Sequence, residues 1–343
     1  MNLLKKFTNR VEELFVRRKE GKAAARLASS ISLKSENSEP VIVVIAMPGC
    51  LHLTLCCISK LPSHRKVIVV ANCCSMREVE ILESFDVEVH QGADFNMPHA
   101  VVIDGLVNAG DEPFWLLDHD CFLSNNEFLT RVESQAKKTN ALGATFFSEN
   151  CDLGIDSVGF GTFLMYLNPK VIRHTQLAYD AGIGVVTWKN MSDRASQKLV
   201  SLGVEVGSYP QKWKGYFDTF RLIDALAHGD GSQFLRLGTL SFLFNLNDIA
   251  MHLGQTSRVM WPKDVSRKKY AAVGAYGSQV LFEKLANVCG DLNGGRLHEL
   301  PRSAEMCSQL MNSNVLSNQE LKYFDSLSNE FESWLKSHLK RQD

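Results

Sequence analysis

Short β-branched segments that alternate with helical ones are the feature that most constrains this chain. The segments "VIVVIAM", from Val41, and "KVIVVA", from Lys66, are continuous apolar runs that are too short for a helix and lack the alternation of a half-exposed strand. Helical periodicity follows each run, and a third run, "PFWLLD", ends at Asp118. Strands that alternate with helices imply right-handed crossovers, so we expect an open α/β fold with a mostly parallel sheet flanked by helices.

Composition excludes several classes of protein. The chain has 343 residues and a formal net charge of -1, which argues against nucleic acid as a partner, because phosphate-binding proteins usually carry a basic excess. Its nine cysteines are an odd number without CxxC spacing, and no secretory signal precedes them. No apolar run reaches the roughly 20 residues of a membrane-spanning helix. These features predict a soluble, cytoplasmic protein with reduced thiols.

The first region, residues 1–38, is expected to be a basic amphipathic helix followed by a polar linker. Apolar residues recur at helical spacing between basic ones, at Leu3, Leu4, Phe7, Val11, Leu14 and Phe15. Such a helix can pack its apolar stripe on its own domain, dock on a partner, or lie on an anionic membrane surface, here the inner face of the membrane.

The main domain is expected over residues 39–265 and a helical region over residues 266–343. The last helix of that region carries an apolar stripe made of Leu321, Phe324, Leu327, Phe331, Trp334 and Leu335. This stripe can cover the main domain or form a homodimer, and the sequence leaves both open.

Two carboxylates follow the third apolar run directly. Asp118 and Asp120, with His119 between them, stand where an open α/β sheet binds its ligands, beyond the carboxyl end of a strand. Mg²⁺ and Mn²⁺ favour one or two carboxylates together with phosphate oxygens, and a bound cation relieves the repulsion between the carboxylates. Ser124 and Glu127, in capping-box spacing, predict a helix that begins just after the two aspartates. The alternative to a metal site is a solvated turn in which Asp120 helps to cap this helix.

Five elements in order resemble a GT-A type glycosyltransferase close to the family 2 nucleotide-sugar enzymes. They cover residues 41 to about 255 and are the first strand running into Pro48, "MPHAVVIDGLVNAGDEPFWLLDHDCFL" with its DxD motif, "VGFGTFLMYLNPKVI", "KGYFDTFRLIDALAHGDG" and "AMHLGQTS". The DxD motif alone is weak evidence, and the order of the five elements is more specific.

The resemblance implies roles for particular residues. Asp120 would bind Mn²⁺ or Mg²⁺ directly, Asp118 would share the metal and lie near the donor sugar, and His252 would be a further metal ligand or a diphosphate contact. Pro48 and Gly161 would lie near the donor. The alternatives are a partly buried structural histidine for His252 and a tight turn for Gly161.

Asp218 would be the general base of an inverting transfer, taking a proton from the acceptor hydroxyl. Many family members have two adjacent acids here, whereas Phe217 occupies the other place in this chain. Asp224 is a reserve candidate for the base, and the alternative role of Asp218 is to cap the helix that follows it. Trp213 and Tyr216 could stack on an acceptor sugar or belong to the core.

The position after the second strand, where family members usually carry an aspartate that contacts the nucleobase, holds Asn72. Its amide can donate and accept hydrogen bonds, so it can still read a pyrimidine edge, and UDP-sugar is the default donor by resemblance only. Asp94 could substitute for the missing acid, or could be an ordinary exposed loop residue.

The expected function is that of a metal-dependent, hexosyltransferase-like and inverting glycosyltransferase. It would move a sugar from a nucleotide-sugar donor to a hydroxyl of a carbohydrate or glycolipid acceptor, in glycoconjugate or surface polysaccharide synthesis. The alternatives are a catalytically silent relative that acts in binding or assembly, and a nucleotidyltransferase. The second would normally carry a glycine-rich, basic loop after the first strand, and "MPGCLHLT" is not such a loop.

Overall fold

The computed structural model describes residues 2–148, 159–210, 215–239, 245–246, 249–253, 265–289 and 316–339. The chain forms two compact units. The first contains Met1–Val41, His90–Trp115 and Glu133–Leu237. The second contains Ile42–Val89, Leu116–Val132 and Gly238–Asp343.

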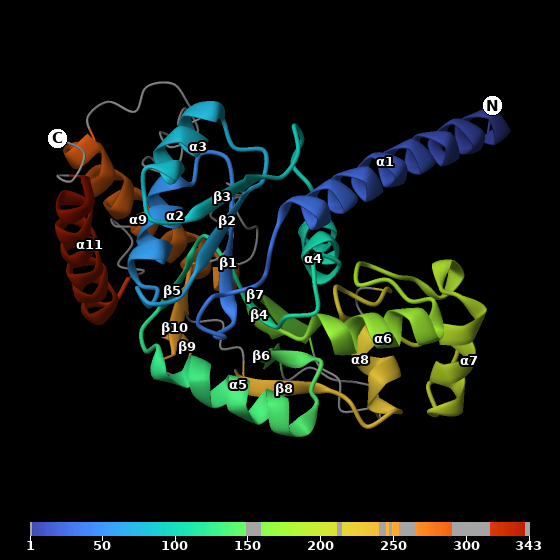
Figure 1. The fold of residues 1–343 in the computed structure, drawn as a ribbon. Helices are drawn as coiled ribbons and strands as arrows, with labels where there is room; N and C mark the ends of the chain where they lie inside the picture. Colours follow the sequence, from blue (N-terminus) through green and yellow to red (C-terminus); the bar gives the residue numbers. More distant parts are fainter. Residues whose placement is uncertain are drawn as a thin grey trace. The chain divides into compact units, whose positions relative to one another are not determined.

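The main sheet has seven strands. They are β1 (Val41–Ala46), β2 (Val67–Ala71), β3 (Glu88–Gln91), β4 (Phe114–Asp118), β6 (Gly143–Ser148), β7 (Gly159–Leu167) and β8 (Phe234–Thr239). They are hydrogen-bonded in the order β3-β2-β1-β4-β7-β6-β8, with β1 parallel to β2 and β6 antiparallel to β7 (Figure 1). The predicted open, mostly parallel α/β sheet is confirmed.

The apolar runs of the sequence are buried strands. Every residue of β1 and β2 is buried, as are the first four residues of β4. Continuous burial explains why these strands show no alternation, because neither face of the sheet meets water there. Polarity begins at the last residue of β4, Asp118, which is half-buried.

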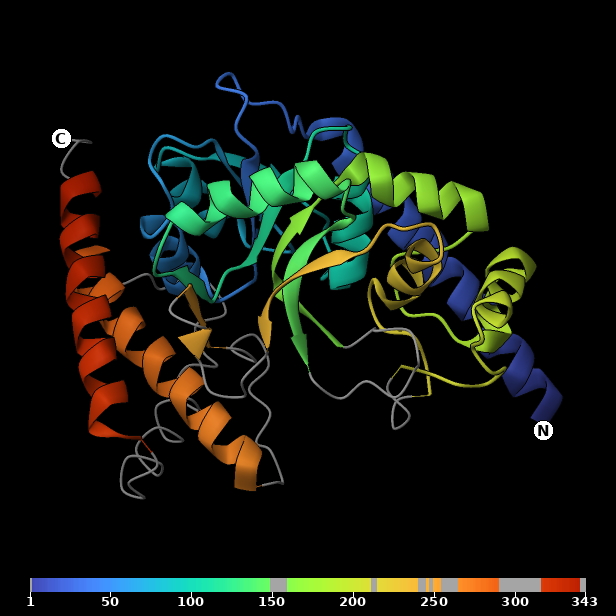
Figure 2. The ribbon, with the colours of Figure 1, turned by 90° about the horizontal axis from the view of Figure 1, so that it is seen from below.

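In the second unit, helices α2 (Leu51–Ser59) and α3 (Met76–Glu83) follow the first two strands. Two further helices, α9 (Val265–Cys289) and α11 (Asn318–Leu339), pack side by side and both contact α2 (Figure 2). A Cβ at Gly277 of α9 would meet the Phe324 ring at 2.5 Å, so the helices approach closely there.

The apolar stripe of α11 is covered within the chain. Its central members, which are Phe324, Leu327, Phe331 and Leu335, are at most 3% exposed. Covering the chain's own helices, one of the two roles that the sequence left open for this stripe, is therefore observed, and a homodimer through these helices stays a prediction.

In the first unit, α1 (Asn2–Ser30) packs against α4 (His99–Val107) through its last turns (Figure 1). Ala23, Ala24 and Leu27 are buried in this contact. A Cβ at Gly105 of α4 would lie only 3.0 Å from the Ala24 carbonyl oxygen, so a small residue is required at this crossing. The other helices of this unit are α6 (Pro169–Tyr179), the 3₁₀ helix η1 (Trp188–Asn190), α7 (Asp193–Ser201) and α8 (Arg221–His228).

One expected boundary was wrong. Helix α5 spans Glu127–Thr139 and does not follow Asp120 directly, because Cys121–Leu123 form strand β5. The backbone N–H of Glu127 donates to Asn125 Oδ1 at 2.8 Å, so this amide oxygen satisfies the first N–H of the helix. Among the described helices, none combines the length and apolarity needed to cross a membrane.

Candidate metal centre

Strand β4 delivers the first carboxylate. Asp118 is its last residue, and the peptide at this point is held from α2, where the Cys57 thiol lies 3.8 Å from the Asp118 carbonyl oxygen. Burial raises the pKa of the Cys57 thiol well above its usual value, so this group stays protonated and can donate. All seven cysteines in the described residues are free thiols, as expected.

A small antiparallel sheet brings the other two side chains together. Strand β10 (Ala250–His252) lies between β5 and β9 (Asn245–Leu246), and its register places His252 opposite Cys121. The backbone N–H of Leu253 donates to the Asp120 carbonyl oxygen at 3.1 Å, which extends this pairing to Asp120 itself. His252 therefore reaches Asp120 although the two residues are far apart in the sequence.

Ligand atoms of Asp118, Asp120 and His252 all lie within 4.8 Å of one another. His252 Nε2 is 3.3 Å from Asp120 Oδ1, and Asp120 is only 3% exposed. Placing two carboxylates so close in a buried position is unfavourable without a positive partner. Two carboxylate oxygens and one imidazole nitrogen are suitable ligands for a divalent cation such as Mn²⁺ or Mg²⁺, so these three residues fit a metal site.

Helix α2 carries a buried histidine, His52, that senses the charge of His119 in this turn. His52 of α2 is 1% exposed, its Nε2 is 2.8 Å from Ser278 Oγ, and its ring meets that of Phe282 edge-on at 5.5 Å. Burial, together with the charge of nearby His119, lowers the pKa of His52 to about 3. His52 is therefore neutral near pH 7. No pattern in the sequence marks this residue.

The loop after β1 is fixed by a carboxylate that the sequence analysis also missed. Gly49, next to the predicted donor residue Pro48, has a positive φ of 76°, and its N–H donates to Glu78 Oε1 at 2.7 Å. The other oxygen of Glu78 accepts from the N–H and the hydroxyl of Ser75, at 2.8 Å each. The S-x-x-E spacing of a capping box would have identified this pair.

Asn72 follows β2, at the edge of the sheet where β1 also ends. Its N–H donates to the Ala46 carbonyl oxygen at 3.0 Å, and its side chain is buried with Nδ2 3.6 Å from Met47 Sδ. The next residue, Cys73, has a positive φ of 62°, which is unusual for a residue other than glycine. The proposed contact of Asn72 with a nucleobase stays a prediction.

Asp218 lies in the first unit, in a turn before α8. This turn is pinned on both sides, because Phe217 exchanges backbone hydrogen bonds with Val186 and the Phe220 N–H donates to the Ile183 carbonyl oxygen. Asp218 Oδ1 accepts from the Thr219 N–H at 2.9 Å. Phe220, with a positive φ of 65°, occupies the N-cap position of α8 and makes no side-chain capping bond, so Asp218 does not serve as the N-cap.

Two other acids of the first unit, Asp224 and Asp94, each lie near a basic side chain. The reserve candidate Asp224 is 5% exposed and pairs with Arg221 at 3.5 Å. Asp94 is an exposed loop residue whose carboxylate lies 3.8 Å from Lys19 Nζ.

Gly161 lies inside strand β7, where its carbonyl oxygen accepts from Thr145 Oγ1 at 2.8 Å, so it is not in a tight turn. Tyr216 is half-buried. Trp213 lies outside the described residues.

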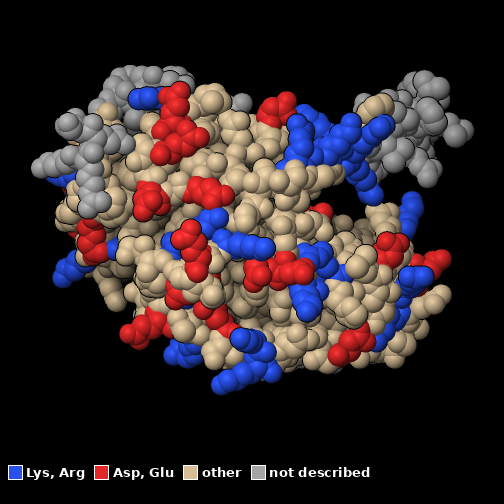
Figure 3. All heavy atoms as spheres, viewed as in Figure 1, with Lys and Arg blue, Asp and Glu red and all other residues tan. Residues whose placement is uncertain are grey.

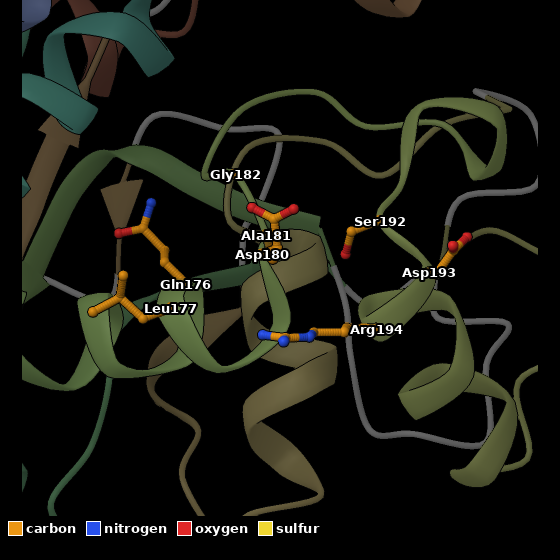
Figure 4. Close-up of a pocket in the computed structure, with 8 residues that line it drawn as sticks. All are labelled: Gln176, Leu177, Asp180, Ala181, Gly182, Ser192, Asp193 and Arg194. Carbon is orange, nitrogen blue, oxygen red and sulfur yellow. The ribbon is translucent and has the colours of Figure 1, made fainter.

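A shallow hollow lies between the end of α6 and the start of α7 (Figure 4). Its lining residues are Gln176, Leu177, Asp180, Ala181, Gly182, Ser192, Asp193 and Arg194. None of the residues predicted to bind donor or metal lines it. The Ser192 hydroxyl bonds to the Tyr179 carbonyl oxygen and caps α7, which is a structural role.

An open α/β sheet with a carboxylate and histidine cluster beyond a strand end is an architecture suited to binding a metal and a phosphorylated ligand. Residues 17–172 match the protein family described as the StrH glycosyltransferase N-terminal domain. This match covers less than half of the chain, and it includes Asp118 and Asp120 but ends before Asp218 and His252. The resemblance to a glycosyltransferase that the motifs predicted is confirmed over this range.

Two solved structures show weak overall similarity. The glycosyltransferase GlyE of Streptococcus pneumoniae TIGR4 is 13% identical with a TM-score of 0.29, over 57% of this chain and 45% of GlyE. The mannosyltransferase PcManGT of Pyrobaculum calidifontis, solved with GDP-Man and Mn²⁺, is 9% identical with a TM-score of 0.36, over 94% of this chain and 92% of that one. Likenesses this weak establish neither fold nor function, and the GlyE alignment spans less than half of GlyE. No curated protein sequence matched the chain.

Proposed function

We propose that this chain is a metal-dependent glycosyltransferase that moves a sugar from a nucleoside-diphosphate sugar to a hydroxyl acceptor. The observation that carries the proposal is the convergence of Asp118, Asp120 and His252, whose ligand atoms lie within 4.8 Å of one another. The family match over residues 17–172 supports the class of reaction. UDP-sugar is the default donor.

In this proposal Asp120 and His252 hold the cation, and Asp118 completes the protein side of the site. When bound, Mn²⁺ or Mg²⁺ would offset the negative charge that develops on the departing nucleoside diphosphate. The imidazole favours Mn²⁺ over Mg²⁺, because Mg²⁺ prefers oxygen ligands. The antiparallel pairing of β5 with β10 supports this role, since it fixes the backbone of both Asp120 and His252.

Asp218 is proposed as the general base of an inverting transfer. Its carboxylate would take the proton from the acceptor hydroxyl as that oxygen attacks the anomeric carbon and the bond to the diphosphate breaks. Two observations support the assignment. The carboxylate is not used to cap α8, and the turn that carries it is fixed by backbone hydrogen bonds at Phe217 and Phe220.

The acceptor is proposed to be a carbohydrate or glycolipid, in glycoconjugate or surface polysaccharide synthesis in the cytoplasm. Donor hydrolysis provides a test that does not require the acceptor. The experiment measures nucleoside diphosphate release from a panel of sugar nucleotides, with Mn²⁺, with Mg²⁺ and with neither, for the wild type and for Asp120→Asn.

We expect release that requires metal and is lost in Asp120→Asn but kept in the matched control Asp193→Asn, which changes an exposed acid. If no donor reacts, calorimetric titration with Mn²⁺ separates the remaining cases. If Mn²⁺ binds and Asp120 is required, the metal-dependent donor site stands and lacks only its acceptor. If no metal binds, the proposal is overturned and a binding or assembly role is favoured.

A further inference from the structure

Helix α1 has two halves with different surroundings. Its last turns are anchored on α4 through Ala23, Ala24 and Leu27, all of which are at most 6% exposed. Nearer its start, Phe15 is 68% exposed and Val16 is 54% exposed. Five other large apolar side chains are also exposed on the described part of the chain, but Phe15 and Val16 are adjacent on one helix, and packing on α4 does not account for their exposure.

The exposed face of α1 has a consistent character. Phe15, Arg18, Lys22 and Arg26 recur at spacings of three and four residues, which places them on one side of the helix, and all four are exposed. The residues buried against α4 occupy another side. Figure 3 shows a basic cluster over the described part of α1, where Arg17, Arg18, Lys19, Lys22 and Arg26 gather.

The same register extends toward the start of the helix in the sequence. Leu4, Phe7 and Val11 precede Phe15 at these spacings, so the pattern changes along one register from apolar residues to basic ones. Residues 2–26 contain eight basic residues and three acidic ones, which are Glu12, Glu13 and Glu20, so this segment carries a net positive charge.

We propose that this face of α1 is a docking surface for an anionic lipid bilayer. The apolar turns would enter the interfacial region, while Arg18, Lys22 and Arg26 would lie among the phosphates of the headgroups. A nucleic acid would favour the basic turns but would leave the apolar turns in water. The attachment of α1 to α4 through Ala23, Ala24 and Leu27 would connect the membrane surface to the first compact unit.

The first test uses the whole wild-type chain and two kinds of vesicle, one of phosphatidylcholine alone and one that also contains phosphatidylglycerol. We expect co-sedimentation with the anionic vesicles only. Raising the ionic strength should weaken it, because salt screens the attraction between exposed charges. No binding by the wild type, or equal binding to neutral vesicles, would overturn the proposal and leave a protein partner as the explanation for the exposed face.

The second test localises the surface. Replacing Arg18, Lys22 and Arg26 together by Glu should weaken binding to anionic vesicles by on the order of a hundredfold or more. The matched control replaces Lys137, Lys138 and Lys170 by Glu, which changes the net charge equally at exposed positions on α5 and α6. This control should bind the vesicles nearly as well as the wild type. If it lost as much binding as the α1 variant, the net charge of the protein, and not the face of α1, would explain the effect.

A further variant, Phe15→Ser, retains every charge and should also weaken binding. Circular dichroism confirms that each variant is folded. Because vesicle binding requires neither donor nor metal, its outcome is independent of the glycosyltransferase proposal.

Discussion

The chain carries two regions with a candidate reactive carboxylate, the turn with Asp118 and Asp120 and the turn with Asp218, and they are built differently. In the first, long-range strand pairing between β5 and β10 brings His252 to Asp120. In the second, one carboxylate stands on a turn held by backbone hydrogen bonds to residues 183–186. The ligand atoms of Asp118, Asp120 and His252 indicate a metal site without reference to any substrate. The single carboxylate of Asp218 can be assigned a catalytic role only once the acceptor is known.

The largest effect is expected at the first turn. Asp120→Asn preserves shape but removes the negative charge, so metal-dependent nucleoside diphosphate release should fall by on the order of a thousandfold. The measurement is donor turnover with saturating Mn²⁺, beside the exposed-acid variant Asp193→Asn as control. If Asp120→Asn kept turnover within a few-fold of the wild type, the metal would have to be held elsewhere.

Asp218→Asn should separate the two regions. Loss of a general base lowers transfer to a hydroxyl acceptor by about a hundredfold, while the affinity for Mn²⁺ should not change, because Asp218 is not part of the metal cluster. The comparison requires kcat for transfer and calorimetric metal binding on the same protein. Asp193→Asn, an exposed acid of the same unit, should change neither quantity. Unchanged transfer in Asp218→Asn would leave the region without a catalytic role.

Much of the fold could be predicted because its signals are local. The continuous apolar runs marked β1, β2 and β4, and their burial on both faces explains the absence of alternation. The pair Asp118 and Asp120 could be placed for the same reason, since a run that stops at two acids marks the end of a strand. The site residues after β4 could be predicted only from the resemblance to a glycosyltransferase family, because no local sequence pattern distinguishes His252 from a structural histidine.

The parts that could not be predicted depend on pairing between distant residues. Strands β5 and β10 have three residues each, too few for a periodic signal, yet they determine that His252 reaches Asp120. The intervening β5 also explains why the start of α5 was placed too early. His52 escaped notice because a single histidine in an apolar helix has no pattern, and only the packing of α9 on α2 shows that it is buried.

A buried histidine beside the first turn predicts a sensitivity to acid. Above about pH 6.5 His52 is neutral in both the folded and the unfolded chain, so it has no effect on stability. Below that pH the unfolded chain takes up a proton, whereas the folded chain does not until about pH 3. The free energy of unfolding should therefore fall as the pH falls, by roughly 2 kcal/mol at about pH 5 from this residue.

Urea unfolding near pH 7 and near pH 5 measures this effect. His52→Gln cannot take up the proton, so the difference between the two pH values should shrink, whereas His64→Gln, at an exposed position, should keep it. An unchanged pH dependence in His52→Gln would show that the His52 side chain is solvated, and not buried, in the folded protein.

The smallest effect is expected at His252. The variant tests whether His252 binds the metal together with Asp118 and Asp120, or only forms a hydrogen bond with Asp120. His252→Ala should weaken Mn²⁺ binding by about tenfold or more, because an imidazole in or beside the coordination shell raises affinity by such factors. The loss should be smaller for Mg²⁺, which prefers oxygen ligands. Calorimetry with both ions, beside His228→Ala at an exposed position on α8, distinguishes the cases. Removal of a nitrogen ligand should lower the affinity for Mn²⁺ more than the affinity for Mg²⁺. An equal loss of affinity for both ions would therefore indicate that His252 orients Asp120 and does not bind the metal.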